Sequence, residues 1–276
     1  MKTGFIGAGK AGTSLGVYFN KHGIPVCGYF SRTEDSSKKA ADLTESTAFT
    51  DIKRLVTESD MIFITTPDGV IGRMAQQLSQ FDLDGKYLCH ISGSLGSGVL
   101  SCATERCASA HPMIAMSGRN TDLSQAFFTM EGDAQTMAEL EKLFAVCGNR
   151  TARIPSEKKP EYHCAASVAS NLMVGLAAMA VDMLSDCGFS KPAALELISP
   201  LMRGNIDAVC EKGPAGALTG PLERADEETI SKHLASLDGR QREIYRLLSL
   251  ELTKVAREKN IDRNYSKIID LLEEKK

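Results

Sequence analysis

The sequence predicts an α/β domain built on a mostly parallel sheet, followed by an all-α domain. Three observations lead to this fold class. Short apolar runs alternate with helix-like patterns through the first half of the chain, as in a parallel sheet covered on both faces. A glycine-rich turn follows the first apolar run, and from Ser156 onward apolar residues recur at the helical period without a convincing strand. We therefore expect a boundary near Pro155, with domains at 1–155 and 156–276.

Eight strands are expected in the first domain. Each is a short apolar run, and they lie at Thr3–Ile6, Val26–Phe30, Ala48–Phe49, Met61–Thr65, Tyr87–Ile91, Ala108–His111, Phe127–Met130 and Thr151–Ile154. Apolar residues spaced three and four apart predict helices between them, among others at Lys10–His22, Asp51–Glu58, Gly69–Gln80 and Asp133–Cys147. This alternation is typical of a doubly wound sheet.

The second domain is predicted to begin with one long helix, Glu157–Cys187. It has no proline after Pro160 and is rich in Ala, Leu and Met, and Gly188 supplies a stop signal. Shorter helices are expected at Lys191–Ile198, Leu201–Glu211, Asp226–Ser236 and Gln241–Asn260, with a polar tail after Ile261.

The glycine-rich turn, Gly7-Ala8-Gly9-Lys10-Ala11-Gly12, comes directly after the first strand and opens the first helix. In a Rossmann domain the first glycine permits the tight turn, the second lets the backbone approach a pyrophosphate, and the third lets the helix pack on the sheet. The N–H groups of the first helical turn then face the phosphates, so Lys10 and Ala11 join the expected site. The alternative is a glycine-rich turn without a ligand.

The end of the second strand indicates which dinucleotide would bind. NAD sites place a carboxylate there for the ribose hydroxyls, but this chain has Ser31 and Arg32. A guanidinium binds phosphate through a planar fork of donors, which favours the 2′-phosphate of NADP. The alternative is an exposed Ser-Arg turn. Thr66 and Pro67, which follow the fourth strand, are expected to line the same cofactor site.

Two histidines follow strands at the expected ligand edge of the sheet. His90 precedes Ser92 in a His-Ile-Ser-Gly-Ser run, and His111 lies in an Ala-His-Pro-Met run. A hydride-transfer enzyme needs a group that exchanges a proton with the substrate, and imidazole suits neutral pH. A structural imidazole that caps the loop is the alternative for either residue. The spacing of the histidines does not support a zinc site, and no metal is expected.

The long helix carries polar residues at four-residue intervals, His163, Ser167 and Asn171. They share one stripe, which we expect to contact the substrate in a cleft between the domains; the alternative is a hydrogen-bonded seam between helices. Thr219, in the glycine-rich segment 213–221, is a further candidate for binding a carboxylate or phosphate. The alternative is that this segment is only a connector between helices.

Composition restricts the class of protein. The net charge of −3 argues against a nucleic-acid partner. No secretory signal is evident and no apolar run looks long enough to span a bilayer, so no membrane partner is expected. The eight cysteines lack paired spacing and are expected to be reduced, mostly buried thiols in a cytoplasmic protein.

Taken together, these motifs resemble uncharacterised bacterial Rossmann-like proteins of the NADP oxidoreductase type, whose C-terminal half is a helical domain of unknown function. The resemblance covers nearly the whole chain. The segments that carry it are the glycine turn, His90-Ile91-Ser92-Gly93, Ala110-His111-Pro112-Met113, Glu131-Gly132-Asp133, Tyr162-His163-Cys164-Ala165-Ala166-Ser167, Ser170-Asn171, Pro200-Leu201 and Ala217-Leu218-Thr219-Gly220-Pro221.

The wider kinship that this resemblance implies is with 6-phosphogluconate-dehydrogenase-like proteins. In the β-hydroxyacid dehydrogenases among them, a catalytic lysine lies four residues before an asparagine. Here Asn171 matches the asparagine, but Ser167 occupies the lysine position. The His-Pro-Met run is similar instead to that of prephenate dehydrogenases, which implies His111 as acid/base with Ser92 as a hydrogen-bonding helper.

The expected activity is therefore NADP(H)-dependent oxidation or reduction of a small, anionic carbonyl, imine or hydroxy compound, in a homodimer formed through the helical domain. The other hypothesis is an NADP-binding sensor or partner protein without hydride chemistry, motivated by the missing lysine.

Overall fold

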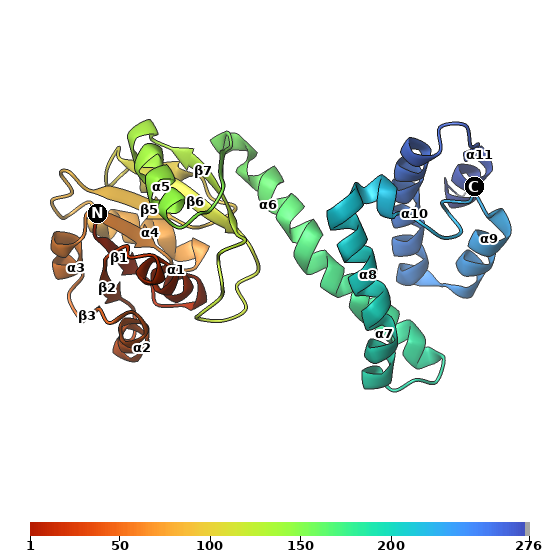
Figure 1. Ribbon diagram of the computed structural model, residues 1–276, viewed down its shortest axis with the longest axis horizontal. Coiled ribbons are helices and arrows are strands. Elements are labelled where there is room, and N and C mark those ends of the chain that lie inside the picture. The colour runs from red at the N-terminus through yellow and green to blue at the C-terminus, as the bar shows by residue number, and fades with distance from the viewer. Residues whose placement is uncertain (274–276) are drawn as a thin grey trace. The chain divides into compact units, whose positions relative to one another are not determined.

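The computed structural model describes residues 1–273, which form two compact units. The first unit comprises residues 1–172, and the second begins at Met173. Figure 1 shows the first unit as a sheet with helices on its two faces, and the second as an assembly of helices. This is the predicted fold class.

A single eight-stranded sheet forms the core of the first unit, in the order β3-β2-β1-β4-β5-β6-β7-β8. All neighbouring pairs are parallel except β6 and β7, which are antiparallel. Each strand overlaps its predicted segment: β1 (Thr3–Ile6), β2 (Val26–Phe30), β3 (Thr47–Phe49), β4 (Met61–Ile64), β5 (Tyr87–His90), β6 (Cys107–Met113), β7 (Phe127–Gly132) and β8 (Thr151–Arg153). The prediction of a mostly parallel, doubly wound sheet is confirmed.

Helices cover both faces of this sheet because successive strand residues point to opposite sides. On one face Phe5 and Phe63 pack with side chains from α1, α2 and α5; on the other Ile6, Ile62 and Ile64 pack with side chains from α3 and α4. The helices are α1 (Lys10–Lys21), α2 (Glu34–Thr44), α3 (Ile52–Glu58), α4 (Asp68–Leu78) and α5 (Ala134–Val146).

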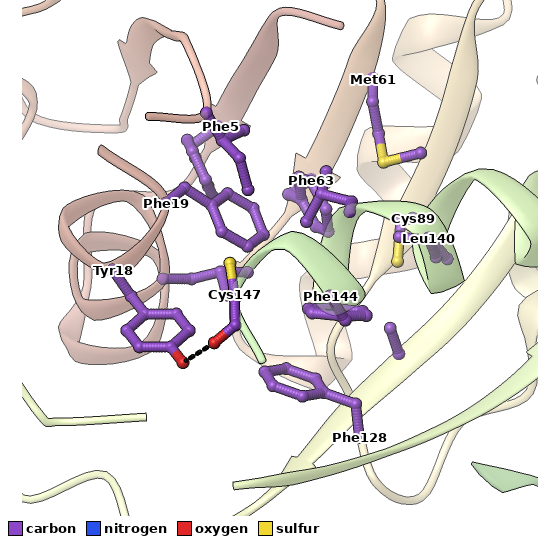
Figure 2. Close-up of a cluster of buried hydrophobic side chains, with 14 of the residues drawn as sticks. Phe5, Tyr18, Phe19, Met61, Phe63, Cys89, Phe128, Leu140, Phe144 and Cys147 are labelled. Carbon is purple, nitrogen blue, oxygen red and sulfur yellow. Dashed lines mark hydrogen bonds between the residues drawn. The ribbon is translucent and has the colours of Figure 1, made fainter. Parts of the chain in front are cut away.

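The first of these two cores is rich in aromatic rings. Phe128 and Phe144 stack with ring centroids 3.8 Å apart, and the hydroxyl of Tyr18 donates a hydrogen bond to the carbonyl oxygen of Cys147 at 3.0 Å. Figure 2 shows this cluster, with the hydrogen bond as a dashed line. Because the contacts join α1 to α5 and β7, the core fixes the helix that starts at the glycine turn.

The first unit extends beyond the predicted boundary at residue 155. After a 3₁₀ turn, η2 (Ser156–Lys158), the chain continues through α6 (Lys159–Ser167) into a π-helical segment, η3 (Val168–Leu172). Lys159, at the start of α6, is 1% exposed and packs into the sheet unit, so this helix belongs to it structurally. π-Helical turns occur frequently at functional sites. A short 3₁₀ helix, η1 (Ser97–Leu100), follows β5.

The second unit contains helices alone among its described residues: α7 (Met173–Asp186), α8 (Lys191–Ala217), α9 (Glu227–Ser236), α10 (Gly239–Lys259) and α11 (Ser266–Glu273). Its core is formed by residues of α9, α10 and α11 together with Leu222. The predicted break between residues 198 and 201 is wrong, because α8 continues through Pro200 and leaves helical geometry only at Gly213. The predicted polar tail is also wrong, since α11 buries Ile268 and Leu272. Residues 274–276 of that tail lie outside the described residues.

The long helix Ser156–Asp186 corrects the expectation about membrane-spanning length. Its most apolar stretch has a mean hydropathy of 1.8, so by length and composition the helix is able to cross a membrane. The prediction looked for an unbroken apolar run. This helix has small residues and a few polar ones among its apolar residues, but its mean hydropathy is still high. No part of that stretch is buried in the described structure.

The expectation that most cysteines are buried is wrong. All eight are free, but Cys102, Cys164, Cys187 and Cys210 are exposed.

Candidate functional site

The glycine turn has the geometry that its sequence predicts. Gly7 has a φ of +113°, which side chains rarely adopt, and its carbonyl oxygen accepts a hydrogen bond from Thr65 Oγ1 at 2.7 Å. A Cβ on Gly12 would collide with Thr65 Oγ1 and lie 2.5 Å from the Gly7 carbonyl oxygen. Gly12 therefore lets α1 pack against the glycine turn. Thr65, which follows β4, holds this turn in place.

The N-terminus of α1 is left free for an anion. Its N-cap is Gly9, no side chain caps the first turn, and the first turn holds no acidic residue. A Cβ on Gly9 would meet nothing within 4 Å. The turn thus exposes backbone N–H groups to open space at the positive end of the helix dipole, which is the arrangement that binds phosphate in dinucleotide sites.

A cavity of about 540 Å³ opens at this turn and runs along the carboxyl ends of β1, β2 and β4. It is the edge at which sheets of this type bind ligands. Six of the nine predicted cofactor residues line the cavity, namely Gly7, Gly9, Ser31, Arg32, Thr66 and Pro67. Lys10, Ala11 and Gly12 do not line it; Lys10 is exposed at the first turn of α1, and Gly12 packs on the sheet.

The side chains around this cavity fit a phosphorylated dinucleotide. Among its lining residues there is no carboxylate, and the buried hydroxyl of Thr66 has no hydrogen-bond partner. The lining also includes Arg73 and Arg119, which sequence reasoning missed. Arg32, Arg73 and Arg119 make no ion pair with any described residue. Unpaired guanidiniums and an orphaned hydroxyl are suited to phosphate and ribose oxygens.

Asp68 joins the cofactor cavity to the loop that carries the histidine motif. It follows Pro67 at the start of α4, and its Oδ2 accepts hydrogen bonds from Ser92 Oγ and Ser94 Oγ, both at 2.8 Å. Ser92 Oγ in turn accepts from the backbone N–H groups of Ser94 and Leu95. The only proton of the Ser92 hydroxyl is therefore directed at Asp68. Ser92 thereby organises the loop, and its help in proton transfer stays a prediction.

The main chain holds the ring of His90, as in the structural alternative, and a role for His90 at the substrate stays a prediction. It is fully buried, its Nε2 lies 3.2 Å from the carbonyl oxygen of Gly96, and its Nδ1 accepts from the backbone N–H of Ser92 at 3.2 Å. Both ring nitrogens are thus used by the main chain. Burial is the main cause that lowers the pKa of His90 to about 4, so the ring is neutral at physiological pH.

His111 and His163 converge on Gly93. A Cβ on Gly93 would lie 2.9 Å from His111 Nε2 and 2.5 Å from His163 Nδ1, so only glycine leaves room for both rings. The two rings meet edge to face with centroids 5.8 Å apart. His111 Nδ1 lies 2.8 Å from the hydroxyl oxygen of Tyr162, a partner that the sequence analysis did not propose. The structure therefore brings the predicted His111 and His163 together at the loop after β5.

The environment of His111 keeps its imidazole neutral. Burial lowers the pKa of His111 to about 4, with smaller contributions from the nearby Lys159 and His163, while Asp68 acts in the opposite direction. Tyr162 has a raised pKa, again because of burial, and stays a neutral hydroxyl. A neutral imidazole whose Nδ1 bonds a phenol can accept a proton at Nε2 or donate one from it, depending on its tautomer.

Lys159 is the second residue that sequence reasoning missed. Its ammonium donates to the carbonyl oxygen of Ser92 at 2.9 Å and to Ser109 Oγ at 2.5 Å, and Ser109 Oγ also donates to the Ser92 carbonyl. Burial lowers the pKa of Lys159, and the nearby carboxylate of Glu131 opposes this shift. Because it is 1% exposed, Lys159 cannot contact a substrate; it ties α6 to the loop after β5 and to β6.

The remaining predicted substrate residues are placed as follows. Ser167 is half-buried in α6, and Asn171 is exposed in the π-helical segment η3, so the stripe begun by His163 continues along the outside of the first unit. Thr219 is exposed and belongs to the second unit. Their contacts with substrate stay predictions. Among the residues that the structure describes, no group of three or more His, Cys, Asp or Glu residues is arranged to hold a metal ion.

Comparison with protein families places this chain in a class. Residues 1–113 match a Rossmann-like domain, and residues 126–252 match a domain of unknown function, DUF2520. The chain therefore combines a segment similar to Rossmann-like domains with a segment similar to DUF2520 domains. The DUF2520 match starts before β7, so it includes the last two strands of the sheet as well as helices of the second unit.

Solved structures share this fold over nearly the whole chain. A protein assigned as an NADP oxidoreductase, from Bacteroides fragilis, is 24% identical with a TM-score of 0.74, over 92% of this chain and 98% of that one. A protein from Thermotoga maritima is 25% identical with a TM-score of 0.75, covering 93% and 98%. Pyrroline carboxylate reductase from Plasmodium falciparum, solved with NADP bound, is 14% identical with a TM-score of 0.61, covering 94% and 96%. No curated protein matches the chain.

Proposed function

We propose that this protein is an NADP(H)-dependent oxidoreductase that acts on a small, anionic carbonyl, imine or hydroxy compound. The observation that carries the proposal is the link between two groups at one edge of the sheet. A cavity lined by arginines and free of carboxylates includes Pro67, and the next residue, Asp68, fastens the loop on which His111 and His163 converge. The fold is also that of NADP oxidoreductases, one of which acts, by its name, on a pyrroline carboxylate.

The cofactor-binding residues are assigned by their chemistry. The turn from Gly7 to Gly9 and the first N–H groups of α1 receive the pyrophosphate, while Ser31 and Arg32 receive the 2′-phosphate. Thr66 Oγ1 supplies a hydroxyl for a ribose or amide oxygen. When bound, NADP(H) would supply or accept the hydride.

His111 is assigned the exchange of a proton with the substrate. Neutral at physiological pH, its imidazole accepts a proton from a hydroxyl or amine substrate in the oxidation direction and returns it in the reduction direction. Tyr162 holds the ring by its hydrogen bond to Nδ1, which leaves Nε2 for the substrate. His163 lies beside His111 and is exposed, so it is assigned to substrate binding together with Ser167 and Asn171.

The first test measures the cofactor. The chain has no tryptophan, so nicotinamide fluorescence can be followed without energy transfer from that source. We expect NADPH to bind more tightly than NADH, and Arg32→Ala to remove most of this preference. Arg150→Ala is the matched control, because Arg150 lies over the ring of Phe127 and does not line the cavity. Failure to bind either nucleotide would reject the proposal.

The second test separates an enzyme from an NADP-binding sensor. A panel of small keto acids, cyclic imines and hydroxy acids is screened for substrate-dependent change in nicotinamide absorbance. We expect turnover on at least one compound, and a loss of about 100-fold or more in His111→Ala with unchanged NADPH affinity. NADPH binding without turnover would favour the hypothesis of an NADP-binding sensor. That hypothesis is based on Ser167, which occupies the position of the catalytic lysine. Unchanged turnover in His111→Ala would reject the role given to His111.

A further inference from the structure

Arg119 reaches the cofactor cavity from a part of the chain far from the glycine turn. It lies on the connection between β6 and β7, residues 114–126, and it lines the same cavity as Gly7, Gly9 and Arg32. The side chain is half-buried. No motif in the sequence assigns Arg119 to a dinucleotide site, and the glycine-turn pattern does not include it.

Hydrogen bonds fasten this connection to helix α1. Ser14, buried in α1, donates from Oγ to the carbonyl oxygen of Gly118 at 3.0 Å and accepts from the backbone N–H of Thr121 at 3.0 Å. Thr121 Oγ1 closes the turn by bonding both the N–H and the carbonyl oxygen of Gly118, at 3.1 Å each. The residues on both sides of Arg119 are therefore held against the helix whose N-terminus opens at Gly9.

The charge of Arg119 is not balanced by protein groups. It forms no ion pair with a described residue, and none of the residues that line the cavity is acidic. A half-buried guanidinium without a carboxylate partner loses hydration without compensation until an anion binds. The segment around Arg119 is attached to α1, whose N-terminus faces the pyrophosphate in dinucleotide sites, and not to the end of β2, where Arg32 lies. This attachment favours the pyrophosphate over the 2′-phosphate as the anion.

We propose that Arg119, which lines the same cavity as the glycine turn, binds the pyrophosphate of the dinucleotide. The inference rests on the proposed NADP(H) binding and extends it. Arg32 binds the 2′-phosphate and so determines the preference for NADPH over NADH. Arg119 contacts the part that both nucleotides share, so it sets affinity without affecting that preference.

The test compares NADPH and NADH affinities of the full-length protein by fluorescence titration. Arg119→Gln is expected to weaken both nucleotides by a similar factor, about 10- to 100-fold, so that the NADPH preference is kept. Arg32→Ala is expected to weaken NADPH alone. Arg106→Gln serves as the matched control, because Arg106 precedes β6 at the opposite edge of the sheet and lies over the ring of Tyr87. It is expected to leave both affinities unchanged.

A second variant checks that the position of Arg119 matters as well as its charge. Ser14→Ala removes both hydrogen bonds that hold Gly118 and Thr121, and it is expected to weaken both nucleotides in the same direction as Arg119→Gln. Wild-type affinity in Arg119→Gln, while Arg32→Ala still loses its NADPH preference, would overturn this inference and leave the proposed function standing. Weakening of NADPH alone in Arg119→Gln would overturn the assignment to pyrophosphate. Absence of binding by the wild-type protein would overturn both proposals.

Discussion

Burial is the main cause that keeps the His111 imidazole neutral, and the buried charge of Lys159 adds to it. The Lys159 ammonium, Asp68, His163 and the Tyr162 hydroxyl are the titratable groups that surround His111. Of these, Lys159 and His163 disfavour the imidazolium and Asp68 favours it. The imidazole is therefore neutral at physiological pH, and its basicity depends in part on a lysine that is itself buried.

Replacing Lys159 with Met should raise the pKa of His111 from about 4 toward its ordinary value, because one positive charge is removed. The change is measured by following the imidazole resonances of His111 by NMR during a pH titration, without need of a substrate. Lys158→Met is the matched control, since Lys158 is exposed and paired with Glu161. If both variants left the His111 titration where it is in the wild type, the electrostatic role of Lys159 would be rejected.

His90 should make the protein less stable in acid. Its pKa is about 4 in the folded state and about 6.5 in the unfolded state, so between these values only the unfolded chain takes up the proton. The free energy of unfolding should therefore fall as the pH drops from about 6.5 to 4, by about 3 kcal/mol from this residue. Urea unfolding across that range measures it. A His90→Asn variant should show a smaller fall, and an equal fall would contradict the assignment.

At the scale of elements, strands were easier to predict than helix ends. The run that forms β4 is apolar on both faces, which is a strong signal for a central parallel strand, and β1 beside it is buried on both faces. Pro200 was interpreted as a helix stop, but α8 accommodates it. Helix α11 was missed because its apolar residues, Ile268 and Leu272 among them, stand in a highly charged segment, although their spacing is helical.

The candidate site was only partly predictable, because tertiary contacts select its residues. His111, His163 and the glycine turn carry local motifs, and they were found. Lys158 and Lys159 are adjacent and chemically identical in sequence, yet only Lys159 is buried. Arg119 enters the cavity through a contact between Ser14 and Gly118, 104 positions apart, which no local pattern encodes.

Helix α11 should contribute measurably to the stability of the second unit. Leu272 is fully buried among residues of α9 and α10, so Leu272→Ala should lower the free energy of unfolding by about 2–5 kcal/mol. Denaturant unfolding followed by circular dichroism measures this. Ile261→Ala is the control, because Ile261 is 87% exposed and should lose little. Equal, small effects of both substitutions would show that α11 does not complete this core.

At the scale of the whole molecule, the helical surface leaves a large apolar area uncovered. On α7 and α8, Val174 is 70% exposed and Leu201 is 67% exposed, and neighbouring leucines and valines are also exposed. Large exposed apolar areas on a soluble protein often mark a site of association. A second copy of the chain is the occupant we propose, and dimerisation was expected from the resemblance; a bilayer is the rival, given the composition of Ser156–Asp186.

Light scattering should therefore give the mass of a dimer, and Leu201→Glu should convert it to a monomer, because an interface leucine would become a charge. Leu43→Glu is the matched control: Leu43 is a similarly exposed leucine, but it lies on α2 of the first unit, so it should leave the mass unchanged. A monomeric wild-type protein that co-sediments with lipid vesicles would reject the dimer in favour of a membrane partner.

The burial of Lys159 also constrains how such proteins exchange parts during evolution. Lys159 and His163 contact the loop after β5, and Tyr162 bonds His111 of β6; all three lie downstream of the last strand, on the helix that leads toward the second unit. A recombination event at residue 155 would join a foreign helix to the sheet and remove all three. A crossover after Leu172 would keep them, so new helical domains could be acquired there while the residues that surround His111 were inherited intact.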